Sequence, residues 1–331
     1  MKIVFFEIED WEKEYISKQF PDAAFSEEKL TQDAAAKFAD SEVISIFIYS
    51  EITAELISKL PNLKFISTRS MGYDHIDLEA CKAKNITVSY VPNYGAHTVA
   101  EHTFSLILAL SRKIIPSVER AKKGNFDSVG LTGFDLFGKT LGVLGTGHIG
   151  ANVCEIALSL GMKVLAYNHH EDSGLVEKGV VYKPLDEVLS LSDIITLHLP
   201  HTKETEHIIN MQNINNFKKG TFLINTARGA LVETQAILYG LEQGIIKGAG
   251  LDVLEEEGQL KEERQFLSKH FLANEDYKTE LINHVLLQRD DVIVTPHNAF
   301  NSTEALHEIL DTNNANIKSY LNGALVNIVG Q

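Results

Sequence analysis

The chain of 331 residues contains few of the residues that crosslink a protein or anchor it in a membrane. Its two cysteines, Cys81 and Cys154, are too few for a disulfide framework or a cysteine metal centre. No apolar run approaches the ~20 residues that span a bilayer, and charged residues occur too early in the first stretch for a secretory signal peptide. We therefore expect a cytoplasmic protein without a metal site or a membrane segment.

Positive charge is scarce as well. Lys and Arg together number 30, against 45 Asp and Glu, so the formal net charge is −15 at pH 7. Such an acidic balance argues against nucleic acid or an anionic membrane as a partner. Any anionic substrate must therefore be attracted by a local positive site.

Hydrophobic residues make up 44% of the chain, and its length is sufficient for two domains with their own cores. Short apolar runs alternate with helix-like stretches, a pattern typical of α/β proteins with parallel sheets. We expect two doubly wound parallel-sheet domains with an active-site cleft between them. The predicted flavodoxin-like domain comprises residues 1–99 and 299–331, and the predicted Rossmann-type domain comprises residues 100–298.

The second domain is organised around the stretch from Thr140 to Asn168, which is predicted to form a strand, a tight turn, a helix and another strand. Gly145, Gly147 and Gly150 give the pattern GxGxxG at the first strand–helix junction. This pattern permits a tight turn and lets a pyrophosphate approach the N–H groups of the helix N-terminus. Glycine-rich turns also occur for packing alone, but the flanking strands favour a dinucleotide-binding unit.

The residue that ends the second strand bears on the choice of cofactor. NAD-binding folds usually have an acid there for the ribose hydroxyls, whereas this chain has Asn168. Asparagine still bonds a hydroxyl, but it lacks the charge that repels the additional phosphate of NADP. No Arg or Lys follows in residues 169–172, and Glu171 and Asp172 disfavour that phosphate. We therefore predict NAD and keep NADP as an alternative.

Three further stretches bear on the organisation of the chain. The predicted helix from Thr98 to Arg112 is apolar on almost every side and is expected to be buried between two bodies. Residues 114–138 show little periodicity, as in an arm, a lid or an interface. Residues 255–291 are too polar and too long for a simple connection, and we expect an elaboration of the domain edge.

Arg228, Glu257 and His297 follow apolar, strand-like runs in the second half of the chain. Because the carboxyl ends of parallel strands meet at one sheet edge, we expect these side chains to converge. Arginine offers a planar fork to a carboxylate, and histidine exchanges a proton near neutral pH. Each residue alone also has a structural interpretation, as a surface charge or as one of 13 histidines. Their shared placement favours hydride transfer to a 2-keto acid.

Six motifs, in order along nearly the whole chain, resemble the D-isomer-specific 2-hydroxyacid dehydrogenases. They are VPNYGAHTVAEH from Val91, GTGHIG from Gly145, LHLPHTKET from Leu197, NTARGALV from Asn225, GLDVLEEE from Gly250 and TPHNAF from Thr295. The resemblance implies that Arg228 binds the substrate carboxylate, that His297 is the general acid or base and that Glu257 is its partner. It also implies a homodimer, built around the predicted interdomain helix and the arm that follows it.

The same resemblance assigns residues to the cofactor and the substrate. The cofactor is expected to contact Gly145, Gly147, His148, Ile149, Gly150, Asn168, Thr226, Ala227 and, near the nicotinamide carboxamide, Asp252. The amides of Met71 and Gly72 are expected to hold the substrate carboxylate, with Tyr94 and Phe300 as walls of the side-chain pocket. Gly258 stands where many members have proline, a departure that we expect to affect only the loop.

Aromatic walls favour a short substituent, and the long segment after Glu257 resembles the D-lactate dehydrogenase branch. We therefore predict an NAD-dependent enzyme that reduces pyruvate to D-lactate. Within enzymes, the alternatives are hydroxypyruvate, glyoxylate, 2-ketoisocaproate or phosphoglycerate, the last disfavoured because no additional basic cluster accompanies the three residues. From another class, the alternative is a non-catalytic module that binds NADH as a sensor.

Overall fold

The computed structural model of the chain describes residues 1–255 and 277–330. Glu257 and most of the predicted elaboration at residues 255–291 therefore lie outside the described residues. The chain divides into two compact units, which we describe one at a time. The first consists of Met1–Gly95 with Ser302–Gln331, and the second of Ala96–Asn301.

The first unit is built on a parallel sheet of five strands in the order β2-β1-β3-β4-β5. Its strands are β1 (Ile3–Phe5), β2 (Ala24–Phe25), β3 (Val43–Ile46), β4 (Phe65–Thr68) and β5 (Thr87–Ser89). This strand order is that of flavodoxin-like sheets, as predicted. Strands β1, β3 and β4 are buried throughout, because a parallel sheet in this fold is covered on both faces.

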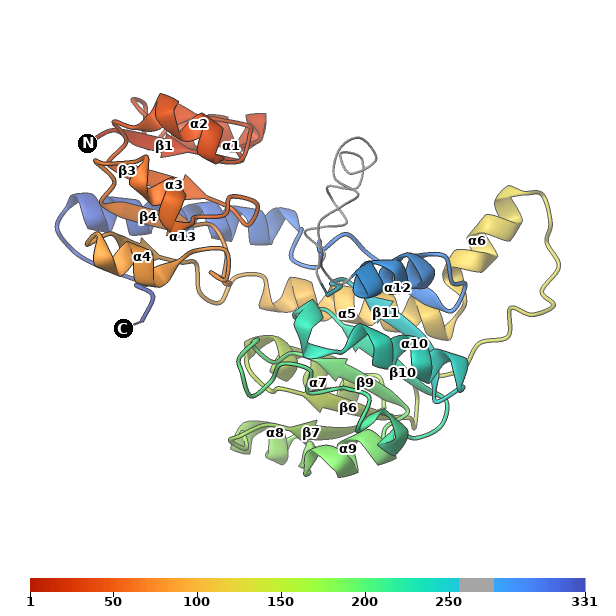
Figure 1. Cartoon of the computed structure of the whole chain (residues 1–331). Helices are drawn as coiled ribbons and strands as arrows, with labels where there is room; N and C mark the ends of the chain where they lie inside the picture. The colour runs from red at the N-terminus through yellow and green to blue at the C-terminus, as the bar shows by residue number, and fades with distance from the viewer. Residues whose placement is uncertain (256–276, 331) are drawn as a thin grey trace. The chain divides into compact units, whose positions relative to one another are not determined.

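Helices cover both faces of this sheet (Figure 1). They are α1 (Asp10–Ser17), α2 (Gln32–Ala35), α3 (Ala54–Ser58), α4 (Leu78–Ala83) and α13 (Thr303–Leu321), with a short 3₁₀ turn, η1 (Ala36–Phe38). Helices α2, α3 and α4 contribute to the core on one face, and α1 and α13 to the core on the other. Leu310 and Ile317 of α13 pack there with Phe5 and Phe65. The last helix of the chain thus completes the N-terminal sheet.

The second unit is built on a parallel sheet of seven strands in the order β12-β11-β10-β9-β6-β7-β8. They are β6 (Thr140–Leu144), β7 (Lys163–Tyr167), β8 (Val181–Tyr182), β9 (Ile194–Leu197), β10 (Thr221–Asn225), β11 (Ile246–Leu251) and β12 (Val292–Val294). The strand order changes direction between β6 and β9, as in Rossmann-type sheets. Ligands of such sheets bind outside the carboxyl ends of the strands at this switch point.

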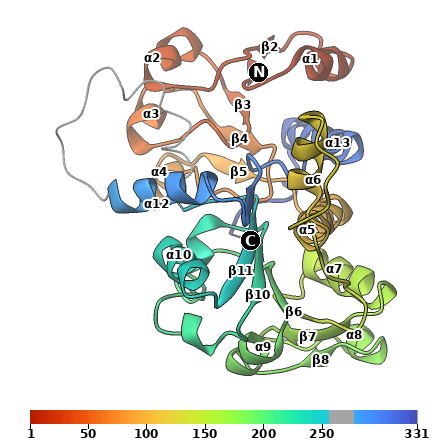
Figure 2. The same cartoon turned by 90° about the vertical axis from the view of Figure 1, so that its right-hand side faces the viewer.

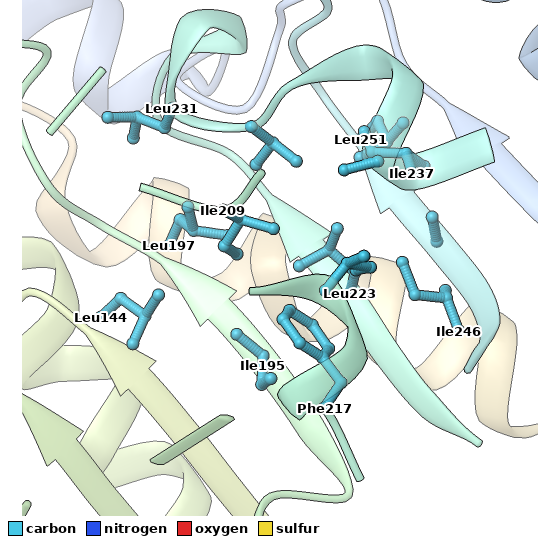
Figure 3. Close-up of a cluster of buried hydrophobic side chains, with 14 of the residues drawn as sticks. Leu144, Ile195, Leu197, Ile209, Phe217, Leu223, Leu231, Ile237, Ile246 and Leu251 are labelled. Carbon is cyan, nitrogen blue, oxygen red and sulfur yellow. The ribbon is translucent and has the colours of Figure 1, made fainter. Parts of the chain in front are cut away.

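Two layers of helices enclose the seven strands (Figure 2). They are α5 (Ala96–Ser111), α7 (His148–Ser159), α8 (Ser173–Glu177), α9 (Leu185–Leu191), α10 (Thr234–Glu242) and α12 (Tyr277–Leu287), with α6 (Ile114–Lys122), η2 (Ile214–Asn216) and η3 (Gly229–Leu231) in the connections. Helices α5 and α7 share a core with one face. The core of the other face includes Leu197, Leu223, Ile237 and Leu251 (Figure 3). Two doubly wound parallel sheets confirm the predicted fold class.

Some local details differ from the predictions. Residues 114–138 are not irregular throughout, because α6 occupies Ile114–Lys122. Its Pro116 lies in the first helical turn, where a missing N–H group breaks no helical hydrogen bond. Helix α5 begins at Ala96, two residues before the predicted Thr98. In the part of the chain that the structure describes, no helix has both the length and the apolar character needed to cross a membrane.

Candidate active site

Three neighbouring strands of the second unit end at the same edge of the sheet. Asn225 of β10 pairs with Leu251 of β11, and Leu251 pairs with Val294 of β12. These are the last residues of their strands, so the segments that follow them leave the sheet side by side. Arg228, Asp252 and His297 lie on these segments. The sheet therefore brings a cation, a carboxylate and an imidazole to one edge.

Asn225 braces the turn that carries Arg228. Its Nδ2 donates to the Arg228 carbonyl oxygen over 2.8 Å, and its Oδ1 accepts from the Ala227 amide over 3.1 Å. Nη1 of Arg228 donates to the Ala227 carbonyl oxygen over 2.8 Å. Asn225 is buried and Arg228 is half-buried. The guanidinium thus leaves the sheet from a turn that a buried amide side chain holds on both sides.

Thr226 and Ala227, which were predicted to line the cofactor, belong to the same turn. The Thr226 hydroxyl lies 2.9 Å from the hydroxyl of Thr103, which in turn donates to the Val99 carbonyl oxygen over 2.8 Å. Thr103 is fully buried on α5. The helix therefore fixes the first residue after β10 through a chain of two hydroxyl groups.

Asp252 is fully buried directly after β11 and accepts several hydrogen bonds. Its Oδ2 accepts from the Ala299 amide over 2.9 Å, and its Oδ1 accepts from the Asn298 amide over 3.1 Å and from the Thr295 hydroxyl. Nε2 of His102, on α5, lies 3.5 Å from Oδ1. Burial alone would raise the pKa of Asp252, but the bonds from His102, Thr295, Ala299 and Asn298 outweigh it and lower that pKa. Asp252 is therefore held as a carboxylate.

His297 is fixed to Asp252 through the backbone. Its amide donates to the Asp252 carbonyl oxygen and to the Thr295 carbonyl oxygen, each over 2.9 Å. Its φ of 51° lies in the left-handed region, which a residue with a side chain rarely adopts. Such conformations persist where the surroundings impose them and are concentrated at functional sites. Asp252 thus determines the conformation of the loop that carries the imidazole.

The acidic run after β11 is described only as far as Glu255, so the predicted partner Glu257 lies outside the described residues. Oε1 of Glu255 lies 2.5 Å from Nε2 of His207. Its Oε2 accepts from the amide and the hydroxyl of Thr234, over 2.9 and 2.6 Å. Both oxygens of Glu255 are thus bound, one by His207 and the other by Thr234.

The GxGxxG turn has the geometry that a dinucleotide needs. Gly145 has a φ of 96°, and a Cβ there would lie 2.6 Å from the His198 carbonyl oxygen, while a Cβ on Gly150 would lie 1.9 Å from the Gly145 carbonyl oxygen. By contrast, nothing lies within 4 Å of a Cβ placed on Gly147, which leaves space for a ligand.

Helix α7 begins at His148, directly after this turn, and no side chain caps it. The amides of His148, Ile149 and Gly150 are therefore oriented for an anion, and the residues present fit the pyrophosphate of NAD.

Asn168 follows β7, whose last residue, Tyr167, pairs with Leu144 before the glycine turn. Its Nδ2 donates to the His170 carbonyl oxygen over 2.9 Å. The NH₂ group of Asn168 is thus used inside its own turn. Its Oδ1 remains as an acceptor for a ribose hydroxyl. This arrangement fits NAD without the carboxylate that is usual at this position.

The other predicted substrate residues are divided between the units. Met71 and Gly72 lie in the loop after β4, where the Ser70 hydroxyl donates to the Gly72 carbonyl oxygen over 2.6 Å. Tyr94 is 9% exposed and belongs to the same first unit. Phe300 belongs to the second unit and follows the segment of His297. Their roles toward the substrate remain predictions.

Sequence reasoning missed His102, Asn225 and His198. All three lie inside motifs that were recognised. The role of His102 depends on a contact with the distant Asp252, and that of Asn225 depends on how the turn of Ala227 and Arg228 folds around it. His198 follows β9 at the switch point; its Nε2 lies 2.9 Å from the Thr196 hydroxyl, and its buried Nδ1 has no partner among the described residues. Burial lowers the pKa of His198 to about 3, which keeps the ring neutral. Its position directly after β9, at the switch point of the sheet, is the signal that could have identified His198 from the sequence.

Over residues 1–255 and 277–330, no three His, Cys, Asp or Glu side chains are grouped for a metal ion.

Comparison with known proteins identifies the family. Residues 104–299 match the family described as "D-isomer specific 2-hydroxyacid dehydrogenase, NAD binding domain". A "2-hydroxyacid dehydrogenase homolog" of Zymomonas mobilis is 37% identical over 317 residues, covering 93% of each chain. D-lactate dehydrogenase of Escherichia coli is 32% identical over 333 residues, covering 98% of each chain.

Among solved structures, D-lactate dehydrogenase from Aquifex aeolicus, complexed with NAD and lactic acid, superposes with a TM-score of 0.90 at 37% identity. The match covers 100% of this chain and 99% of that one. The family model, the full-length relatives and the strand order therefore agree with the glycine turn and the residues at the sheet edge. The chain belongs to the D-isomer-specific 2-hydroxyacid dehydrogenases, which are NAD-dependent oxidoreductases.

Proposed function

We propose that the protein is a D-lactate dehydrogenase that reduces pyruvate to D-lactate with NADH. The observation that carries this proposal is the alignment of Arg228, Asp252 and His297 on three adjacent strand ends of the sheet that also bears the glycine turn. The named relatives that are D-lactate dehydrogenases, and the solved one that contains lactic acid, support pyruvate and D-lactate as the substrate pair.

Bound NAD supplies the hydride-transfer chemistry at C2 of the substrate. Arg228 binds the substrate carboxylate with its planar fork and polarises the keto group. His297 donates a proton to the keto oxygen during reduction and removes it during oxidation, with Glu257 as the partner of the imidazole. The amides of Met71 and Gly72 hold the carboxylate from the first unit, and Tyr94 and Phe300 restrict the substituent at C3.

We also propose that the protein is a cytoplasmic homodimer. Phe126, Val129 and Phe137, which follow α6, expose 86%, 74% and 81% of their surface. Ile114, Ile115 and Val118 of α6 are exposed as well. Exposed apolar side chains in this stretch of the chain support an interaction surface there. Sedimentation equilibrium should give twice the 36.8 kDa of the chain, and Phe126→Asp with Val118→Asp should give the monomer; a wild-type monomer would contradict the proposal.

The substrate is tested with purified protein, NADH or NADPH, and pyruvate, hydroxypyruvate, glyoxylate, 2-ketobutyrate and 2-ketoisocaproate. We expect the highest kcat/KM with pyruvate and NADH. A specific observation favours one alternative: a relative of Thermofilum pendens, 35% identical over 298 residues and covering 87% of this chain and 82% of its own, is named glyoxylate reductase. A higher kcat/KM with glyoxylate would select that alternative. Equal rates with NADPH would show that Asn168 relaxes the choice of cofactor.

A further inference from the structure

Glu255 contacts three other segments of the second unit, two through its carboxylate and one through its backbone. It reaches His207, which follows β9, and Thr234, which begins α10. Its own backbone carbonyl oxygen accepts from Nδ2 of the buried Asn283, on α12, over 2.8 Å. The Glu255 side chain is 16% exposed, so its charge is largely withdrawn from water and is matched by protein donors. A charge with this many partners fixes the geometry of the segments that it joins.

The turn that carries Arg228 lies in the chain between His207 and Thr234, the two residues that bind the Glu255 carboxylate. Arg228 is the N-cap of η3, and Thr234 begins the helix that follows. At Gly229, an added Cβ would lie 2.2 Å from the Leu254 carbonyl oxygen and 2.5 Å from the Glu255 nitrogen. The turn is thus in direct backbone contact with the end of the β11 segment. Any displacement of residues 254–255 must be transmitted to the residue next to Arg228.

His207 holds the same turn from the other side. Its backbone amide donates to the Ala230 carbonyl oxygen over 2.8 Å. Two residues further along the chain, Ile209 forms an isolated parallel β-bridge with Val232. His207 has a φ of 48°, a conformation that its partners must impose. Its ring and its backbone therefore bind Glu255 and η3 at the same time.

We propose that Glu255 and His207 form a positioning clamp that fixes the turn of Arg228 and thereby the direction of its guanidinium toward the substrate carboxylate. Glu255 is a positioning residue rather than a catalytic one, because both of its oxygens are bound within the protein. The inference rests on the proposed role of Arg228 in substrate binding. Bidentate binding of a carboxylate depends strongly on direction, so a loosened turn weakens substrate binding before it affects the cofactor.

The test compares Glu255→Ala, which removes every side-chain tie, with Glu255→Gln, which keeps an oxygen for Thr234 and loses the charge. Glu155→Gln is the matched control, since Glu155 forms an exposed ion pair with Lys178 over 2.6 Å on α7. Two readouts are used: amide hydrogen exchange of residues 226–234, and the KM for pyruvate alongside the Kd for NADH. Hydrogen exchange needs no turnover and therefore tests the clamp even if the proposed substrate is wrong.

We expect Glu255→Ala to accelerate exchange in residues 226–234 but not in the first turn of α7, and to raise the KM about tenfold or more with little change in the NADH Kd. Glu255→Gln should fold like wild type and lie in between, and Glu155→Gln should match wild type in both readouts. Unchanged exchange in both Glu255 variants would overturn the clamp. Faster exchange with an unchanged KM would overturn the link between the clamp and Arg228. An increase in the NADH Kd as large as the increase in the KM would overturn it as well. Absence of turnover in the wild-type protein would instead contradict the proposed function.

Discussion

The amide of His297 donates to the backbone carbonyl oxygen of Asp252 over 2.9 Å, and the side chain of Asp252 binds the two amides that follow His297 in the chain. A buried carboxylate at the end of β11 therefore shapes the loop after β12. His102 of α5 adds a further contact from outside the sheet. The position of the imidazole depends on the residues that surround Asp252, and this dependence can be measured.

Replacing Asp252 by Asn removes one of the two acceptor oxygens and turns an N–H group toward donors. We expect a loss of about 1–3 kcal/mol in the free energy of unfolding, because a buried donor remains unsatisfied, together with a lower kcat. Urea denaturation monitored by circular dichroism gives the first quantity and steady-state kinetics the second. Glu155→Gln serves as the control on the surface. A fully stable and active Asp252→Asn protein would show that the carboxylate does not hold the loop.

Replacing His297 by Gln removes the proposed proton donor while an amide of similar length remains. We expect kcat for pyruvate reduction to fall by about 10²–10⁴, the range for loss of general acid catalysis, while the Kd for NADH changes little. In the wild-type protein, the reductive rate should fall and the oxidative rate should rise with increasing pH, because reduction needs a proton donor and oxidation needs a proton acceptor. Identical pH profiles of the chemical step in both directions would remove His297 from this role.

Replacing Arg228 by Lys keeps the charge but loses the planar fork. We expect the KM for pyruvate to rise and kcat to fall, with a larger effect for Arg228→Ala, because bidentate binding of the carboxylate is lost in both variants. The comparison of Lys with Ala separates the effect of charge from that of geometry. Wild-type kinetics in Arg228→Ala would exclude Arg228 from the site.

The low pKa of His198 predicts a pH dependence of stability. Burial lowers this pKa to about 3 in the folded protein, whereas an unfolded histidine has a pKa of about 6.5. Between these values the unfolded state binds a proton that the folded state does not, so the contribution of His198 to stability is present above pH 6.5 and is lost as pH falls toward 3. We expect wild type to lose more stability than His198→Gln between pH 7 and pH 5, as measured by urea denaturation. The exposed His170→Gln should behave like wild type, and equal losses in wild type and His198→Gln would contradict a buried neutral ring.

The sequence was sufficient to predict the two parallel sheets, because several of their strands are apolar runs such as Ile3–Phe5 and the glycine turn is recognisable from its spacing. The strands β2 and β8 were missed, since two residues give no period. Helix α6 was missed as well, because its exposed apolar side chains do not show the pattern of a helix that packs on a core.

At the sheet edge, the sequence indicated which residues follow the strands but not what holds them there. His102 and Asp252 are far apart in the chain, so their contact is visible only in three dimensions, and the bond from Asn225 to the Arg228 carbonyl oxygen depends on how the local turn folds. Glu255 illustrates the same limit. It belongs to the acidic run that predicts a partner for His297, yet its contacts are with His207 and Thr234.

We propose that residues on one sheet edge make this protein a stereospecific NAD-dependent dehydrogenase of D-lactate. The most direct measurement is the appearance of NADH absorbance when the wild-type protein and Arg228→Ala are each given NAD with D-lactate or with L-lactate. We predict NADH formation with wild type and D-lactate, none with L-lactate, and a strongly reduced rate with Arg228→Ala. Equal rates with both isomers, or no NADH with D-lactate while NAD binds tightly, would contradict this function.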